Sequence, residues 1–350
     1  MSLARRPLLR AAGGAAFAAL AGAAGSVAAG ATPPAVLQRP ALRTPLAPGA
    51  AMLALARAGR RLVAAGERGI VLTSDDEGRS WTQAQVPVQV SLTALRFADD
   101  RHGWAAGHLG VLLATADAGA SWTLKLDGVR AAQLTLDAAP DDAARKHAQR
   151  LVEDGPDKPF FDLEIGSAGA LVVGAYGLAL ESRDGKRFTS FAPRLPNPKR
   201  LHLYGARAAG ERLLIVGEQG LMLRSLDGGA GFEALASPYK GSFFGLLSAR
   251  SGTLLAYGLR GNVLRSTDFG GRWAAVNTGV PVGISAAVER DDGALVLLAQ
   301  TGDLFTSRDD GLHFERRPAA PPFPATALAP AGKGALVLAG LRGLRRVEAA

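Results

Sequence analysis

Six aspartates recur at one place in a repeated motif, and they are the first residues of this sequence that could do chemistry. The motif reads Ser/Thr-x-Asp-x-Gly-x-x-Trp/Phe, and the copy around Asp184 is one residue shorter. Its aspartates are Asp76, Asp117, Asp184, Asp227, Asp268 and Asp309. A carboxylate in a turn can accept the backbone N–H groups of that turn, and the glycine after it takes a positive φ without strain. Because all six occupy one equivalent position, the pattern predicts structural Asp-box turns rather than catalytic acids.

Other catalytic patterns have little support. The five histidines lack metal-ligand spacing, there is no cysteine, and no motif for a nucleophilic serine, a nucleotide phosphate or a dinucleotide is present. A glycosidase needs two carboxylates that face one cleft, and Glu67 and Glu218 are the only repeat-turn acids that could supply them. We therefore predict no catalytic residue, no metal site and no cofactor, with a glycoside hydrolase as the alternative.

The Asp-box motif belongs to a longer unit that starts with a GxxG turn and an apolar strand. The units begin at residues 66, 107, 174, 217, 258, 299 and 340, and all steps but one are 41 or 43 residues long. A period of about 40 to 50 residues with four short strands is typical of a β-propeller blade. The sequence thus predicts an all-β, seven-bladed β-propeller over residues 32–350.

The one long step, of 67 residues, marks an insertion at 128–158 between blades two and three. Residues 140–155 predict a helix, because Asp141 and Asp142 suit its N-terminus and Gly155 with Pro156 ends it. Connections between blades emerge on the face that carries the GxxG turns, so we expect the helix to lie over that face. Inserted elements on rigid scaffolds often bind partners, although a decorative loop is the alternative.

The GxxG turns carry the residues that we predict to bind. Their two middle positions differ from blade to blade, as binding positions on a repeat do. The predicted binding residues are Glu67, Arg68, His108, Tyr176, Glu218, Arg260 and Arg342. Arg345 and Arg346 are expected to extend a basic patch for an acidic partner or a carboxylate; solvated turn charge is the alternative.

Aromatic residues at the starts of first strands also approach this face. They are Phe160, Phe161, His202, Tyr204, Phe243 and Phe244. They could present an aromatic surface, or they could belong to the core.

The N-terminus has the pattern of an export signal. A basic segment is followed by an apolar run of Ala and Gly, and Ala29-Gly30-Ala31 suits cleavage near Ala31. Arg5 and Arg6 resemble a twin-arginine signal, with an ordinary secretory signal as the alternative. No later run approaches 18 apolar residues, so we expect a cleaved signal over 1–31 and a soluble, monomeric periplasmic body.

The net charge of +9 is spread along the chain, and without an aromatic–basic module no nucleic-acid partner is expected.

Residues 35–45 are predicted to close the ring. Unit seven stops soon after its third strand, so blade seven lacks an outer strand, and 35–45 contain a strand-like run. Pro40 is compatible with an outermost strand. A linker is the alternative.

One unit carries a family resemblance. FADDRHGWAAGHLGVLLATADAGASW (97–122) resembles a blade of the photosystem II assembly and stability factor family, a branch of the bacterial-neuraminidase-repeat propellers. The matching residues are Phe97, Asp99, Gly103, Trp104, Gly107, Gly110, Thr115, Asp117, Gly119 and Trp122, and weaker copies cover roughly 50–347. The resemblance implies an exported, non-enzymatic assembly factor that binds membrane-protein partners.

Two functions follow from the sequence. The first is a periplasmic accessory factor for an inner-membrane transport, export or photosystem-like complex, which binds through the GxxG face and the insertion. The second is a carbohydrate-active propeller, either a hydrolase related to sialidases or a lectin. The sialidase Phe/Tyr-Arg-Ile-Pro signature is absent from the sequence.

Overall fold

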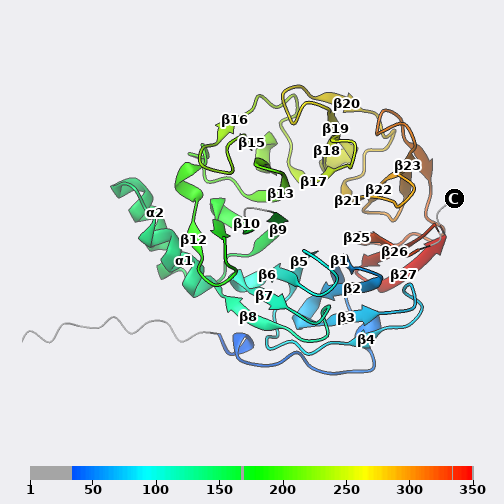
Figure 1. Cartoon of the computed structure of the whole chain (residues 1–350), viewed down its shortest axis with the longest axis horizontal. Coiled ribbons are helices and arrows are strands. Elements are labelled where there is room, and N and C mark those ends of the chain that lie inside the picture. Colours follow the sequence, from blue (N-terminus) through cyan, green and yellow to red (C-terminus); the bar gives the residue numbers. More distant parts are fainter. Residues whose placement is uncertain (1–33, 167–168, 333, 349–350) are drawn as a thin grey trace, which may run out of the picture. The chain divides into compact units, whose positions relative to one another are not determined.

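A computed structural model of the chain describes residues 34–166, 169–332 and 334–348. Residues Pro33–Ala350 form one compact unit, in which seven antiparallel sheets surround a central axis (Figure 1). Six sheets have four strands and the seventh has three, and in each sheet the strands follow their order in the sequence. The predicted seven-bladed β-propeller is therefore confirmed.

Each blade runs outward from the axis. The first strands lie innermost, and they are β1 (Met52–Ala58), β5 (Leu92–Phe97), β9 (Phe160–Gly166), β13 (Leu203–Ala209), β17 (Phe243–Ser248), β21 (Ile284–Glu289) and β25 (Ala325–Pro330). The second strands are β2 (Arg61–Gly66), β6 (Gly103–Gly107), β10 (Gly169–Gly174), β14 (Arg212–Gly217), β18 (Leu254–Gly258), β22 (Leu295–Ala299) and β26 (Ala335–Gly340).

The third strands are β3 (Val71–Ser74), β7 (Leu112–Thr115), β11 (Ala179–Ser182), β15 (Met222–Ser225), β19 (Val263–Ser266), β23 (Leu304–Ser307) and β27 (Gly343–Glu348). The fourth strands are β4 (Thr82–Gln83), β8 (Thr123–Leu126), β12 (Thr189–Ser190), β16 (Glu233–Ala234), β20 (Ala274–Val276) and β24 (Glu315–Arg317).

The core lies between neighbouring blades. Second strands such as β18 and β22 are buried along their whole length, because side chains on both faces of each blade meet an adjoining blade. The aromatic residue of each Asp box contributes to these layers. Trp122 of blade two lies in one buried cluster with Val63 and Val71 of blade one, and Phe188 of blade three packs against Trp104 of blade two with ring centroids 6.0 Å apart. Interblade packing thus explains the regular aromatic position of the repeat.

The predicted strand at residues 35–45 is wrong. This segment runs along blade one instead, where Ala41 donates its N–H to the Val86 carbonyl and Gln89 donates to the Val36 carbonyl. It contains only the 3-10 turn η1 (Ala35–Leu37), and the β25–β26–β27 sheet keeps three strands among the described residues. Prolines lack the N–H that a continuous ladder requires, and Pro40 and Pro45 interrupt the run, so isolated hydrogen bonds replace a ladder.

The ring closes through packing between blades one and seven. β1 contacts β25 and β26, and the Thr326 hydroxyl donates a 2.7 Å hydrogen bond to the Met52 carbonyl. Leu62 of blade one packs with Val337 of blade seven in one buried apolar cluster. Closure therefore rests on the same interblade contacts that join the other blades.

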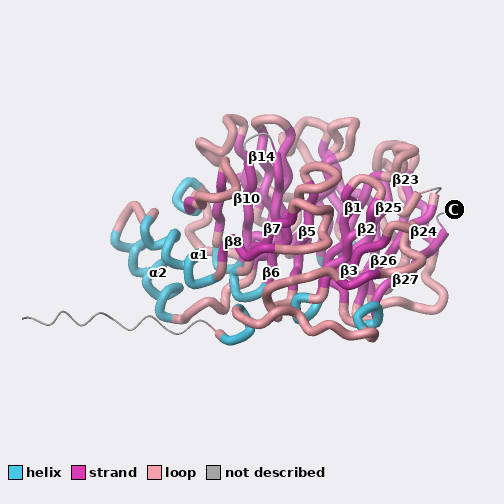
Figure 2. Tube along the Cα trace, turned by 60° about the horizontal axis from the view of Figure 1, so that its bottom comes forward, coloured by secondary structure: helices cyan, strands magenta, loops and turns pink. Residues whose placement is uncertain are grey.

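The insertion forms two helices, α1 (Gly128–Asp137) and α2 (Asp142–Glu153). The helix predicted within 140–155 corresponds to α2, with Asp141 as its N-cap, whereas α1 was not predicted. Asp127 caps α1 by accepting the Arg130 N–H at 2.9 Å. The helices lie outside the ring, with α1 against β12 and the turn at His108–Gly110 (Figures 1 and 2). The expected position over the GxxG face is therefore wrong, because α1 buries its apolar side on the flank of blade three.

The Asp-box aspartates bond to their own turns. Asp76 accepts the N–H groups of Arg79 and Ser80 at 3.0 and 2.9 Å, and Asp309 accepts that of His313 at 3.0 Å. These donors hold the carboxylate pKa values below their usual range; for Asp76 the largest cause is the Ser80 hydroxyl, and for Asp309 it is the His313 N–H. The pKa values of Asp117, Asp184, Asp227 and Asp268 are lowered as well.

We expect these lowered pKa values to make the fold acid-sensitive. A carboxylate with a depressed folded-state pKa contributes stability that is complete above its unfolded pKa, about 3.9, and is lost as pH falls toward the folded value. The free energy of unfolding should therefore decline from about pH 4 downward, as measured by denaturant titration at successive pH values. Asp227→Asn should make this decline shallower, and an unchanged slope would contradict the assignment.

No helix of the described residues is long and apolar enough to cross a membrane. The predicted export signal, its twin-arginine motif and its cleavage site lie outside the described residues.

Candidate functional site

The GxxG turns form one edge of the ring, where most of the short helical turns lie (Figure 2). In blade one the turn η3 (Glu67–Gly69) is closed by the Ile70 N–H on the Glu67 carbonyl, and the Glu67 N–H bonds to the Ala51 carbonyl, just before β1. The same bonds recur in η4 (His108–Gly110), η5 (Ala175–Gly177), η7 (Glu218–Gly220) and η8 (Leu259–Gly261). The backbone is thus fixed by repetition, and the middle side chains are free to differ.

Both glycines of the turn are required, for different reasons. The first has extended φ, but a Cβ on Gly66 would lie 2.1 Å from the Ala51 carbonyl oxygen. The last has positive φ, and a Cβ on Gly69 would also meet the Val88 carbonyl oxygen at 2.0 Å. The two glycines of the GxxG motif are therefore explained by two places where a backbone carbonyl oxygen lies too close for a Cβ atom.

The structure exposes the predicted cationic and aromatic turn residues on this edge. Arg68, His108, Tyr176, Arg260 and Arg342 are all exposed, and Arg68 borders a cavity of about 560 Å³ beside Leu42 and Leu46.

The expected extension of the basic patch is wrong for Arg346. Arg345 stacks on Phe323, 4.5 Å from the ring centroid, and Arg346 lies 3.8 Å from the Glu77 carboxylate in the Asp-box turn of blade one. Arg345 stays near the GxxG edge, because the Phe323 N–H bonds to the Thr301 carbonyl in the corresponding turn of blade six, whereas Arg346 reaches the Asp-box turn.

Glu67 and Glu218 serve the scaffold. Glu67 accepts the Ala51 N–H at 3.0 Å and Glu218 accepts the His202 N–H at 3.2 Å. Each carboxylate therefore satisfies the backbone just before the first strand of its own blade. No group of three or more His, Cys, Asp or Glu in the described ranges could hold a metal ion. The six Asp-box carboxylates lie in the turns between third and fourth strands, at the opposite edge of the ring.

A ring of seven side chains surrounds the channel near the GxxG edge. In each first strand the second residue is skipped in the pairing register, which marks a bulge, and bulges re-aim side chains. All seven bulge residues line the channel: Leu53, Thr93, Phe161, Tyr204, Phe244, Ser285 and Thr326. The three aromatic rings come from the consecutive blades three, four and five, so one side of the channel mouth is aromatic.

The Ser and Thr hydroxyl groups of this ring donate hydrogen bonds to backbone carbonyls of the propeller itself. Thr93 donates to the Phe160 carbonyl of the next blade at 2.7 Å, and Ser285 donates to the Leu298 carbonyl at 3.2 Å. The aromatic side therefore provides the larger partly exposed surface of the channel mouth.

Five rings form a continuous aromatic cluster from this mouth to the GxxG edge. They are Tyr176, His202, Phe161, Tyr204 and Phe244, with successive ring centroids 4.8 to 6.4 Å apart. His202 is fixed by the Tyr176 N–H, which donates to its Nδ1 at 2.8 Å. Tyr176 is 48% exposed, and the Lys158 ammonium lies 5.7 Å from its ring centroid.

Sequence reasoning named all five rings but could not separate them from their neighbours. Tyr176 was a predicted binding residue and Phe161, His202, Tyr204 and Phe244 were candidates, but so were Phe160 and Phe243, which are fully buried. The bulge determines which of two adjacent aromatic residues faces the channel, and the position of the bulge cannot be predicted from the local sequence. Lys158 was not predicted.

Deeper in the channel, four charged residues from three blades form a network. The Arg207 Nη1 lies 2.6 Å from an Asp162 oxygen and 3.6 Å from a Glu164 oxygen. Arg96 lies 3.6 Å from Asp162 and 3.7 Å from Glu164. Burial raises the pKa of Glu164, although Arg96 and Arg207 act in the opposite direction. This network was not predicted, because its partners lie on different blades.

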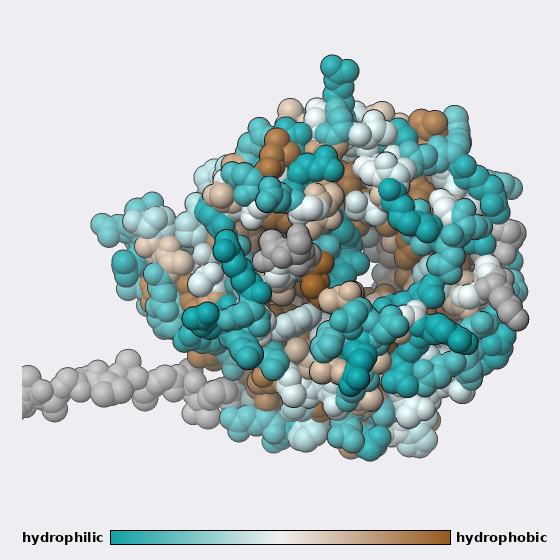
Figure 3. Space-filling model, in the orientation of Figure 1, coloured by the Kyte–Doolittle hydropathy of each residue, from teal (hydrophilic) through white to brown (hydrophobic). Residues whose placement is uncertain are grey.

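The opposite face of the ring is mainly hydrophilic around a central hollow (Figure 3). The aromatic side of the channel mouth and the exposed Tyr176 thus make the GxxG edge the stronger candidate for a binding surface.

No protein-family model and no curated protein sequence matches the chain. Solved structures do match in fold. The structure of YCF48 bound to a D1 peptide shares 14% identity at a TM-score of 0.62, over 86% of this chain and 94% of that one. YCF48 from Cyanidioschyzon merolae shares 13% identity at 0.60, over 86% and 96% of the two chains.

These matches show the propeller fold. The WD40 β-propeller domain of Doa1 matches with a TM-score of 0.60 as well, at 8% identity over 85% of this chain and 92% of that one. At such identities the structural likeness does not assign a function.

Proposed function

We propose that this protein is a non-enzymatic binding protein that holds a segment of a protein partner on the GxxG edge, at the aromatic cluster. The observation that carries the proposal is the partly exposed series of five rings from Tyr176 to Phe244, which come from one GxxG turn and from the bulged starts of first strands. Aromatic residues are enriched at protein interfaces, where they bury large areas at a low entropic cost.

Two observations support a protein partner over a sugar. A propeller of the same fold, YCF48, is described with a bound D1 peptide. Glu67 and Glu218, the carboxylates that a hydrolase would need, are engaged by the backbone of their own blades. Together with the predicted export signal and the family resemblance of 97–122, these observations favour a periplasmic assembly or accessory factor of an inner-membrane complex.

Partner capture from the cell envelope tests this function. The wild-type protein should retain a specific inner-membrane protein, and Tyr176→Ala with Phe244→Ala should reduce its recovery about tenfold or more, because central aromatic contacts dominate interface energies. Leu226→Ser is the matched control, because Leu226 is 55% exposed in an Asp-box turn on the opposite edge. It should leave recovery unchanged.

Charge reversal at Arg68, Arg260 or Arg342 should weaken capture less than the aromatic variant, because exposed charges mainly affect the association rate. Retention on a glycan array, without any envelope protein, would overturn the proposal in favour of a carbohydrate-binding propeller.

A further inference from the structure

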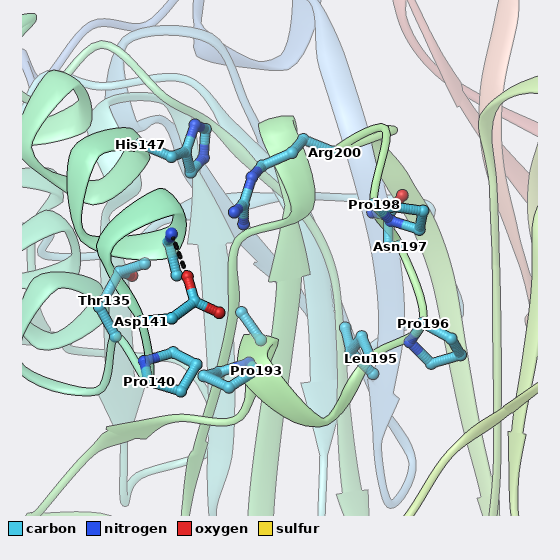
Figure 4. A pocket seen from close by; sticks show the side chains of 13 residues that line it. Thr135, Pro140, Asp141, His147, Pro193, Leu195, Pro196, Asn197, Pro198 and Arg200 are labelled. Atoms are coloured by element: carbon cyan, nitrogen blue, oxygen red, sulfur yellow. Dashed lines mark hydrogen bonds between the residues drawn. The ribbon is translucent and has the colours of Figure 1, made fainter.

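A cleft of about 260 Å³ opens between α2 and the loop that joins β12 to β13 (Figure 4). The insertion contributes Thr135, Pro140, Asp141 and His147, and the loop contributes Pro193, Leu195, Pro196 and Arg200. One wall is thus proline-rich and apolar, and the other end carries Arg200 and His147.

Arg200 occupies an unusual backbone position. Its φ is +55°, a left-handed conformation that residues other than glycine rarely adopt. Asn197 holds the loop, because its side chain donates to the Leu201 carbonyl at 2.9 Å and accepts the Leu201 N–H at 3.0 Å. Backbone strain of this kind persists where the surroundings impose it and is concentrated at functional positions.

The Arg200 guanidinium points into the cleft (Figure 4). Its neighbours in sequence are ion-paired, since Arg194 lies 2.6 Å from Glu181 and Arg207 lies 2.6 Å from Asp162. Arg200 forms no ion pair with any residue that the structure describes. The Asp141 carboxylate in the same cleft accepts the Ala144 N–H at 2.8 Å as the N-cap of α2.

His147 faces the same end of the cleft. Burial lowers its pKa, and the positive charges of Arg200, Arg150 and Lys158 act in the same direction, whereas the backbone of Tyr176 raises it. A bound anion would oppose these positive charges. The cleft also adjoins the aromatic cluster, because a Cβ on Gly177, next to Tyr176, would lie 3.8 Å from the Arg200 Cα.

We propose that this cleft binds a carboxylate of an acidic peptide segment, with Arg200 and His147 as the anchors and the proline-rich wall as the contact for an adjoining apolar side chain. Arginine pairs with carboxylates through two parallel N–H donors. The inference rests on the proposed function and extends it, because the segment would continue from the aromatic cluster into the cleft beside Tyr176.

Isothermal titration calorimetry with short peptides tests the site. The probes are acetyl-Ala-Leu-Glu-Leu-Ala-amide, its Gln counterpart, and acetyl-Ala-Leu-Ala-Leu-Ala with a free carboxyl terminus. We expect one or both carboxylate peptides to bind with a Kd at or below about 1 mM. Which of the two binds shows whether the site takes a side-chain or a terminal carboxylate. The Gln peptide should bind at least about tenfold more weakly. Succinate that binds while neither carboxylate peptide does would overturn a peptide as the occupant.

Variants at Arg200 provide the decisive comparison. Arg200→Gly removes the guanidinium and suits the left-handed backbone, so it should fold and lose at least about tenfold in affinity. Arg200→Lys should retain part of the affinity. Lys199→Ala removes an exposed charge from the same loop outside the cleft and should change little. Equal affinity of Arg200→Gly and the wild type would overturn the site.

The pH dependence gives a second readout. A bound carboxylate raises the pKa of His147, so binding takes up a proton and should strengthen from pH 8 to pH 5.5, where the peptide carboxylate is still ionised. His147→Gln should abolish this dependence, and its persistence in that variant would overturn the role of His147. If the peptides do not bind but the protein still captures its partner from the cell envelope, the binding site in this cleft is rejected and the proposed function is not. Peptide binding that is lost in Arg200→Gly, without envelope capture, would reject only the broader function.

Discussion

Replacing Gly261 by Ala should destabilise the propeller by about 4 kcal/mol, one of the largest effects that a single methyl group can have in this fold. Gly261 ends the GxxG turn of blade five with φ of +73°, and a Cβ there would lie 2.0 Å from the Val280 carbonyl oxygen. That oxygen belongs to the connection leading to blade six, so the methyl group would force two blades apart. Denaturant unfolding followed by tryptophan fluorescence would measure the loss.

Gly279 separates the two causes of this effect. It also has a left-handed backbone, with φ of +68°, but a Cβ there would meet nothing within 4 Å. Gly279→Ala should therefore cost only the left-handed strain, roughly 1–2 kcal/mol. If both variants lost the same free energy of unfolding, the close approach of the carbonyl oxygen would not be the reason that glycine recurs at the end of the turn.

This contrast explains why the sequence revealed the blades so clearly. The GxxG and Asp-box motifs meet local constraints that recur around the ring. In six blades a Cβ on the first glycine of the GxxG turn would lie 2.0 to 2.3 Å from the carbonyl oxygen just before the first strand, and blade six has Ala299 at this position. Gly69, Gly220 and Gly261 all face a backbone oxygen at 2.0 to 2.1 Å. A constraint that recurs in most blades leaves a recurring pattern in the sequence, so the number of blades and the turn positions could be predicted.

The ends of the chain and the insertion were less predictable, because each occurs once. Residues 35–45 have a strand-like pattern, but their prolines and the neighbouring 83–89 segment decide their path. Helix α1 begins at Gly128, a residue that is unfavourable inside helices, and its stability comes from packing against β12 and the turn at His108–Gly110. Tertiary contacts of this kind have no local signature.

The candidate site was predictable by region but only partly by residue. The variable turn positions indicated the GxxG edge, and Tyr176 lies within the aromatic cluster. Arg200 was missed, and the only hint in the sequence is a step of 43 rather than 41 residues from blade three to blade four. That extra length lies in the connection whose proline-rich loop holds Arg200, and its left-handed φ cannot be read from residue type.

The charged network lies deeper in the channel than the aromatic cluster. Removing its central cation, Arg207, should cause the second large loss in the free energy of unfolding. Arg207→Met should cost about 3–5 kcal/mol at pH 7, because it leaves buried carboxylates without their main partner. The Asp162 and Glu164 side chains are only 13% and 16% exposed. Arg57→Met is the matched control, since Arg57 pairs with the largely exposed Asp291 and should contribute at most about 1 kcal/mol.

The pH dependence distinguishes lost charge pairing from lost packing. Burial already raises the pKa of Glu164, and removing Arg207 removes one of the two cations that oppose this. A carboxyl with a raised folded-state pKa regains stability as pH falls, because protonation removes the buried charge. The deficit of Arg207→Met should therefore shrink between pH 8 and pH 5, above the range in which the Asp boxes titrate. A deficit that stayed constant across this range would attribute the loss to packing.

The same variant connects the network to binding. Asp162 follows Phe161 on β9, and it also accepts the Ala206 N–H on β13 at 3.1 Å, two residues beyond Tyr204. The network thus ties together the strands that present two of the three channel-mouth rings. Arg207→Met with Glu164→Gln removes one cation and one carboxylate together, so it should recover part of the stability. If the network positions these rings, partner capture should recover in parallel with stability.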